Sequence, residues 1–225
     1  MQQPVQKKIV LVFWALVILE LTAIAANISS LHFVVKPLLI PSLLILLVVS
    51  KTTVPGKQLL IYGLLFSWAG DVLLMFEDRH VLFFIFGLIS FLTTHVFYIL
   101  YFLRIRSQKI SLLKKRPVLP ALVLAYGVTL VWQLFPHLGD LKVPVIIYAA
   151  VICAMLICCL HIVLKVNKKA SAFYLIGATA FVISDSLLAI NKFYQPFAFA
   201  GVFIMLTYCA AQYFIINGFI EQDNT

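Results

Sequence analysis

Charged residues are scarce in this chain of 225 residues, at 11%, whereas hydrophobic residues make up 64%. A water-soluble domain of this size needs more charge to cover its surface, so the composition excludes one and indicates that the bilayer is the solvent. Acidic residues are the rarer charged kind, with 8 against 17 basic residues and a net charge of +9. The basic residues lie in short segments between apolar runs, which is typical of membrane orientation signals and not of a nucleic-acid surface. We therefore expect no nucleic-acid partner.

Cysteine pairs and metal-binding patterns are also lacking. The four cysteines form neither a CxxC pair nor a disulfide framework, and each lies within an apolar run. We expect them to be buried, weakly polar packing residues. The five histidines do not have the spacing of metal ligands. The sequence therefore predicts no metal and no cofactor.

Long apolar runs dominate what is present, and eight of them are near the 20 or so residues that a transmembrane helix needs. Short gaps with Pro, Gly, Asn and charged residues separate them. The first run ends in a sequence that faintly resembles a signal-peptidase site, but its length predicts a retained helix. We predict an all-α, polytopic membrane protein with one domain, residues 1–225, built as a bundle of eight transmembrane helices. The predicted helices cover residues 8–26, 31–50, 57–76, 80–103, 117–135, 143–164, 171–190 and 198–220.

The distribution of Lys and Arg predicts the orientation of this bundle. Thirteen basic residues fall on the side of the two termini, and only three fall on the opposite side. The excess places both termini in the cytoplasm. The thirteen are Lys7, Lys8, Lys51, Lys57, Arg104, Arg106, Lys109, Lys114, Lys115, Arg116, Lys165, Lys168 and Lys169, and the three are Arg79, Lys142 and Lys192.

Two aspartates occupy matching places in the third and seventh predicted helices. Asp71 lies in the segment GDVLL and Asp185 in the segment SDSLL. Sliding the sequence by 114 residues superimposes these segments and gives eight identities over 46 ungapped positions. This weak pattern predicts a helix-pair repeat between helices 3–4 and 7–8. An offset of four helices preserves direction, so both aspartates would lie at one depth.

Ionisable residues inside the membrane predict an internal site. An aspartate in the hydrocarbon costs about 2.5–3.5 kcal/mol on insertion scales. Glu20, Lys36, Asp71 and Asp185 come from four different helices, and each lies roughly 7–9 Å below the non-cytoplasmic boundary at 1.5 Å per residue. Groups at one level are expected to face one another, so we predict a polar pocket that opens toward the outer leaflet.

Further residues could line this pocket or tune the charge of its aspartates. Ser186 directly follows Asp185, so its hydroxyl should point elsewhere unless the helix bends. The candidate substrate-binding or charge-tuning residues are Lys36, Glu20, Asn27, Ser67, His95, Tyr98, Ser184, Asn191, Tyr194, Tyr208 and Gln212.

Structural roles compete with functional ones for several of these residues. Glu20 and Lys36 could form a salt bridge between the first two helices, and Lys36 could snorkel outward or lie at a turn broken by Pro37. His95 could be an interhelical hydrogen-bonding residue. For Asp71 and Asp185 nothing obvious neutralises both. Two nearby carboxylates in a low dielectric tend to share one proton, which suits a general acid beside a general base. We predict that these two are the catalytic residues.

The same motifs, in order, resemble those of the YhhN family. They are Lys36-Pro37 in the second helix, Gly70–Leu74 in the third, Phe86-Gly87 with His95–Tyr98 in the fourth, and Ser184–Ala189 in the seventh. Characterised members of that family are lysoplasmalogenases. The resemblance implies hydrolysis of the vinyl ether bond of a lysophospholipid within the membrane, with no cofactor. It also implies a fatty aldehyde and glycerophosphocholine or glycerophosphoethanolamine as products.

Other classes of protein remain open alternatives. A small membrane transporter or lipid-binding protein would also contain buried charges and a repeat. An intramembrane aspartyl protease is disfavoured because Trp68 replaces the first glycine of its Gly-x-Gly-Asp element. A zinc lipid hydrolase of the alkaline ceramidase kind would need three clustered histidines. We expect a multi-pass protein of the cytoplasmic membrane in a bacterium, or of the endoplasmic reticulum in a eukaryote; the oligomeric state is left open.

Overall fold

The computed structural model describes residues 4–105 and 110–222, and within these segments the regular structure is entirely helical. Helices are expected because no water is present in the bilayer core to satisfy an unpaired backbone. Each of the eight predicted apolar runs forms a helix whose ends lie within four residues of the prediction. The all-α prediction is confirmed. These helices are α1 (Pro4–Ala25), α2 (Ser29–Val49), α3 (Lys57–Leu74), α4 (Val81–Arg104), α6 (Val118–Leu134), α7 (Lys142–Ile162), α8 (Lys168–Ala189) and α9 (Ala200–Gln222).

Seven helices in the described part of the chain are long and apolar enough to cross a membrane. The multi-pass prediction is therefore confirmed. The remaining helix, α3, has 18 residues and carries Asp71, and it packs against α2 and α4. The count of eight spans and the direction of crossing stay predictions. The short elements were not predicted: α5 (Leu112–Lys115), the 3₁₀ turns η1 (Phe135–His137) and η2 (Gly139–Leu141), and a π-helical turn, η3 (Ile190–Tyr194), that continues α8.

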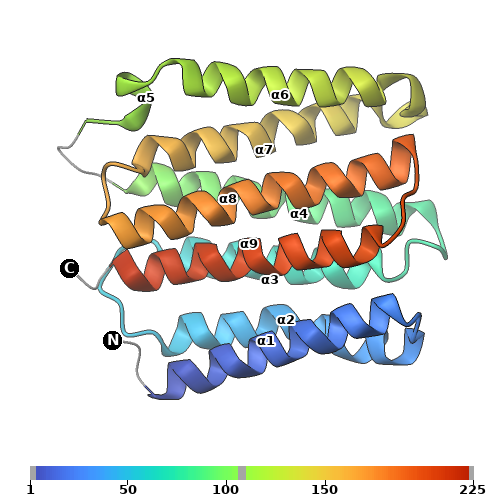
Figure 1. Ribbon diagram of the computed structural model, residues 1–225, viewed down its shortest axis with the longest axis horizontal. Helices are drawn as coiled ribbons and strands as arrows, with labels where there is room; N and C mark the ends of the chain where they lie inside the picture. Colours follow the sequence, from blue (N-terminus) through green and yellow to red (C-terminus); the bar gives the residue numbers. More distant parts are fainter. Residues whose placement is uncertain (1–3, 106–109, 223–225) are drawn as a thin grey trace.

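The helices lie roughly side by side, with two closely packed pairs at the centre (Figure 1). The pairs α3–α4 and α8–α9 have the most extensive helix contacts, and they are the pairs that the sequence offset relates. α1 and α2 lie at one edge of the bundle and α6 at the other (Figure 1). Most of α6 is exposed; its buried residues are Gly127 and Leu134. α6 therefore contributes little to the interior of the bundle.

Both ends of the described chain, Pro4 and Gln222, lie at one end of the bundle (Figure 1). α3 and α8 both begin at that end, so the predicted common direction of the two aspartate helices is observed (Figure 1). Two of the basic residues used for the orientation, Arg106 and Lys109, lie outside the described residues.

Small residues let the two central helix pairs pack closely. A Cβ atom on Gly63 of α3 would lie 2.5 Å from Cε1 of Tyr98, and one on Gly177 of α8 would lie 2.9 Å from the backbone nitrogen of Ile215. These two glycines are also related by the 114-residue offset. Close approach through small residues is the usual basis of helix packing in membranes. The cysteines are free and buried or half-buried, as expected: Cys153, Cys158, Cys159 and Cys209.

Candidate active site

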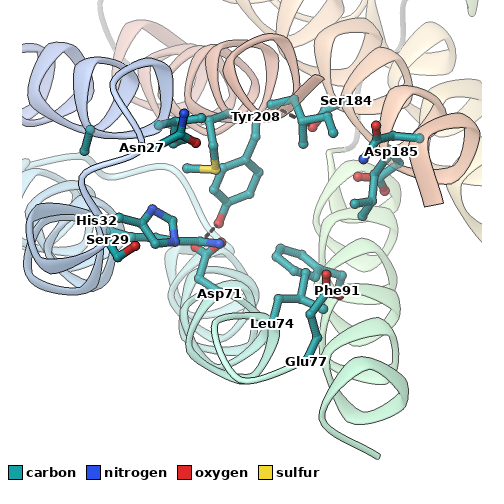
Figure 2. A pocket seen from close by; sticks show the side chains of 18 of the residues that line it. Asn27, Ser29, His32, Asp71, Leu74, Glu77, Phe91, Ser184, Asp185 and Tyr208 are labelled. Carbon is teal, nitrogen blue, oxygen red and sulfur yellow. Dashed lines mark hydrogen bonds between the residues drawn. The ribbon is translucent and has the colours of Figure 1, made fainter. Parts of the chain in front are cut away.

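A cavity of about 390 Å³ lies near the end of the bundle opposite Pro4 and Gln222. Both predicted aspartates line it, and they point into the same hollow from opposite sides (Figure 2). Asp71 lies near the end of α3, and Asp185 lies in the last turns of α8. The structure thus brings together two carboxyl groups that are 114 residues apart in sequence. Five other predicted site residues line the same cavity: Asn27, Lys36, Ser184, Asn191 and Tyr208.

Asp71 is held from across the cavity by α9. Its carboxyl group is nearly inaccessible, with 2% of the residue exposed. The hydroxyl of Tyr208 donates a hydrogen bond of 2.5 Å to its Oδ2 atom (Figure 2). Within the described residues, no other side chain donates a hydrogen bond to Asp71. Tyr208 therefore fixes the orientation of a buried carboxyl group.

A buried chain of hydrogen bonds continues from Tyr208 away from the cavity. Ser67 Oγ lies 2.7 Å from the Tyr208 hydroxyl, Gln212 Nε2 donates to Ser67 Oγ over 2.7 Å, and the Tyr98 hydroxyl donates to Gln212 Oε1 over 2.5 Å. A tyrosine hydroxyl has one proton, and Tyr208 gives it to Asp71, so Ser67 must donate to Tyr208. The hydroxyls of Tyr98, Ser67 and Tyr208 and the amide of Gln212 then all donate in one direction, toward Asp71. Such aligned bonds strengthen one another.

Asp185 has a different set of partners. Its Oδ2 atom accepts a hydrogen bond of 2.5 Å from the Tyr148 hydroxyl of α7 and lies 3.0 Å from His95 Nε2 of α4. The side chain of Asp185 is 13% exposed, whereas that of His95 is fully buried. His95 Nδ1 has no partner among the described residues, which favours a neutral imidazole with its proton on Nε2. His95 is therefore a direct partner of Asp185, whereas the sequence placed it on the pocket floor.

The polar wall formed by α1 and α2 differs from the prediction. Glu20 does not pair with Lys36; its Oε1 atom lies 2.7 Å from Nδ1 of His32, so the salt bridge that the sequence left open as an alternative is not observed. The physical reason is that α2 begins at Ser29, which places His32 within its first turns and facing Glu20. Lys36 is half-buried on the cavity wall and has no ion-pair or hydrogen-bond partner in the described part of the chain.

Other side chains can be compared with their predicted positions. Tyr194 does not line the cavity: it is 57% exposed and packs edge-on against His137. Ser186 points away as expected, because its hydroxyl donates to the Val182 carbonyl and accepts from Tyr126. Sequence reasoning missed His32, Glu77 and Tyr148. Of the three, only His32 could have been noticed in the sequence, because a histidine is unusual in an apolar helix. A tyrosine in an apolar run, such as Tyr148, and a glutamate after a helix end, such as Glu77, are common.

Two smaller apolar cavities continue from the main cavity next to Asp185. One of about 40 Å³ shares Asp185 and Leu188 with the cavity and is also lined by Leu88 and Tyr148. A second, of about 200 Å³, shares Leu88 and Tyr148 with the first and lies between α4 and α7. Its other lining residues are Ile85, Ile89, Leu92, Leu141, Pro144 and Ile147. The site is therefore polar at one side, has two carboxyl groups in its middle, and continues into apolar space.

This arrangement suits acid–base chemistry on a lipid-like molecule. Two carboxyl groups across one cavity can donate a proton and stabilise a cation or activate water. No group of three or more His, Cys, Asp or Glu side chains able to hold a metal ion occurs among the described residues. The residues that could contact a ligand are carboxyl, ammonium, imidazole, amide and hydroxyl groups beside apolar walls.

Comparisons with known proteins identify the family of the chain. The model of the YhhN family matches residues 31–219. A protein named lysoplasmalogenase from Mycobacterium tuberculosis is 30% identical over 193 residues, which are 84% of this chain and 71% of that protein. Proteins named lysoplasmalogenase TMEM86A are 30% identical over 175 residues in Bos taurus (76% of this chain, 68% of the relative) and over 173 in Homo sapiens (75% and 68%). No solved structure matches the chain at a significant level.

Proposed function

The chain belongs to the YhhN family, and we propose from this membership and from the site that it is a lysoplasmalogenase. Such an enzyme hydrolyses the vinyl ether bond of a lysoplasmalogen. The observation that carries the proposal is that Asp71 and Asp185, from two separate helix pairs, line one cavity. The proposal assigns the chemistry to these two carboxyl groups.

The first step is transfer of a proton to carbon. One aspartate, in its acid form, protonates the β-carbon of the vinyl ether, and the π electrons of the double bond form the new C–H bond. The α-carbon becomes an oxocarbenium ion that shares its positive charge with the ether oxygen. The second aspartate, as a carboxylate, stabilises this cation, as a carboxylate does in glycoside hydrolysis. Asp71 and Asp185 fill these two roles.

The second step consumes water. A water molecule attacks the α-carbon and gives its proton to a carboxylate, which leaves a hemiacetal. The hemiacetal collapses when its hydroxyl loses a proton and the bond to the ether oxygen breaks, with that oxygen taking up a proton. The products are a fatty aldehyde and glycerophosphocholine or glycerophosphoethanolamine. One water molecule is consumed, and both aspartates return to their starting forms.

The surroundings of the aspartates match the two ends of such a substrate. We place the phosphate on the α2 side, where the ammonium of Lys36 lines the cavity. Lys36 makes no ion pair or hydrogen bond with another described residue. The hydrocarbon chain is placed beyond Asp185, in the apolar hollows between α4 and α7. With these ends fixed, the vinyl ether bond lies between the two carboxyl groups.

Mass spectrometry of purified protein tests the function. The protein is incubated in detergent with a lysoplasmalogen, with its saturated ether analogue and with an ester lysophospholipid. Only the vinyl ether should be cleaved, because only its β-carbon accepts a proton to give an oxocarbenium ion. Lysolipid binding without cleavage would favour the alternative, a transporter or lipid-binding protein.

Substitution of the aspartates tests the site. Asp71→Asn and Asp185→Asn should each lower aldehyde release by at least 100-fold, since general acid–base groups contribute about 10² to 10⁴ in rate. Asp140→Asn is the matched control, because Asp140 lies at the same end of the bundle, in η2 and outside the cavity lining. Wild-type activity in a folded Asp71→Asn or Asp185→Asn variant would remove the aspartate pair from the mechanism.

A further inference from the structure

One side of α2 presents a row of polar groups to the cavity. Ser29, His32 and Lys36 all line it, and they are three and four residues apart. This spacing places them on one face of a helix, one turn above another. His32 and Asp71 lie on the same side of the hollow in Figure 2. The row therefore faces the position that the reacting part of a substrate would occupy.

A buried carboxylate lies behind His32. Glu20 is completely buried, and its Oε1 atom is 2.7 Å from His32 Nδ1. Its other oxygen, Oε2, has no hydrogen-bond partner among the described residues. A buried carboxyl group needs a hydrogen-bond donor, and the imidazole of His32 supplies it. Because Nδ1 is bonded to Glu20, the ring is fixed with its Nε2 side free to act as a second donor.

Two nitrogen-bearing side chains on this wall are available to a ligand. Lys36 forms no ion pair in the described residues, although its charge acts on Asp71, whereas Glu77, an acidic residue of the same cavity, is paired with Lys192 at 3.3 Å. The two aspartates are oriented by tyrosine hydroxyls, away from a direct ion pair with this wall. An anion that enters the cavity can therefore contact the Lys36 ammonium and the Nε2 side of His32 directly, whereas Asp71 acts on them only at a distance.

We propose that His32 and Lys36 together bind the phosphate diester of the lysolipid head group, and that Glu20 is the residue that positions His32. This inference rests on the proposed function for the identity of the lipid. His32 is a binding residue that touches the substrate, and Glu20 acts through it. His32 and Lys36 make the enzyme select lipids that carry a phosphate over neutral ether lipids with the same hydrocarbon chain.

Kinetics on a matched pair of substrates test the proposal. The two substrates are a lysoplasmalogen and the same alkenyl glycerol without its phosphate head group. His32→Gln and Lys36→Gln should each raise KM for the phospholipid by about 10- to 100-fold, the size of a lost hydrogen bond to a charged group. The loss in kcat/KM should be at least tenfold greater for the phospholipid than for the neutral lipid, so that any general effect on Asp71 is subtracted. His137→Gln is the control, since His137 is an exposed histidine at the same end, outside the cavity lining.

Two further variants separate positioning from a merely structural role. Glu20→Gln should raise KM for the phospholipid as His32→Gln does, and the double variant should be no worse than either single one. His32→Lys places an N–H donor at this position and should recover part of the lost affinity. Equal losses on the phospholipid and the neutral lipid, or no loss on either, would overturn the assignment of a phosphate site.

A binding measurement keeps this proposal separate from the proposed function. The saturated ether lysophospholipid and the saturated ether glycerol are not substrates, so their affinities are measured by titration in detergent. Wild-type protein should bind the phosphate-bearing analogue at least tenfold more tightly, and His32→Gln should remove that preference. Glycerophosphocholine should compete weakly, whereas inorganic phosphate should not compete at comparable concentration. Equal wild-type affinity for both analogues would refute the phosphate site even if the vinyl ether is cleaved. Tighter binding of the phosphate-bearing analogue without cleavage of the vinyl ether would refute only the lysoplasmalogenase activity.

Discussion

The hydroxyl of Tyr208 gives the sharpest test of how the site works. Tyr208→Phe removes the 2.5 Å hydrogen bond to Asp71 and separates Asp71 from Ser67 and the buried chain behind it. A hydrogen bond to a charged group contributes about 1.5–3 kcal/mol. If this bond holds Asp71 in its reactive orientation, its loss lowers kcat by about 10- to 150-fold at 1.36 kcal/mol per factor of ten. The ring remains, so packing against Phe91 and Phe181 is retained.

The matched control is Tyr148→Phe on the other side of the cavity. It removes a bond of the same length to Asp185, but His95 Nε2 still lies 3.0 Å from the same oxygen. The expected fall in kcat is therefore smaller, about tenfold or less. Aldehyde release is measured at saturating lysoplasmalogen, and thermal unfolding in detergent confirms that both variants are folded. A wild-type kcat for Tyr208→Phe, or a larger loss for Tyr148→Phe, would refute the reasoning.

Three more predictions concern packing, the hydrocarbon chain and metals. Gly177→Ala should destabilise the protein by about 1–3 kcal/mol, because its Cβ would lie 2.9 Å from the backbone nitrogen of Ile215. Gly87→Ala should destabilise it less, because its close contacts are with the Leu74 side chain and the nearest backbone atom is 3.6 Å away; thermal unfolding compares the two variants. Ile147→Trp should narrow the hollow between α4 and α7 and lower activity on long-chain but not short-chain lysoplasmalogens. Val128→Trp, in the apolar groove between α6 and α7, is its control and should leave both rates unchanged. Activity should persist in a metal chelator, and loss of activity there, restored by zinc, would contradict an aspartate mechanism.

The positions of helices along the chain could be predicted because apolar runs and their interruptions determine them. The charge distribution gave the relative direction of the helices, and depth then placed Asp71 and Asp185 at one level. Their common cavity was predicted from this shared depth and from the cost of placing a charge against lipid, which requires each helix to turn its aspartate inward.

The partners of the aspartates could not be predicted, because they depend on the rotation of each helix about its own axis. Tyr148 is one aromatic residue among many in an apolar run, and only the structure shows that its hydroxyl reaches Asp185. The alternative of a salt bridge between Glu20 and Lys36 is not observed, because the α2 side chain that reaches Glu20 is His32, one helical turn before Lys36. Tyr194 was placed in the pocket from its position in sequence, but it lies in the π-helical turn η3, where its ring packs against His137.

The hydrogen bonds of the two aspartates show why both central helix pairs are needed. Asp71 of α3 is bonded by Tyr208 of α9, and Asp185 of α8 is bonded by His95 of α4, so each aspartate is held by the second helix of the other pair. Tyr98 and Gln212, which the 114-residue offset relates, bond directly to each other between the pairs. One pair alone therefore cannot form either half of the site. The exchange is symmetric in its layout but not in its chemistry, since Asp71 receives one donor at the end of a buried chain and Asp185 receives two. Two carboxyl groups in equal surroundings would bind a proton equally well, so neither would be favoured as the acid or the base. The difference in hydrogen-bond donors gives the two groups different proton affinities and so allows one to act as the acid and the other as the base.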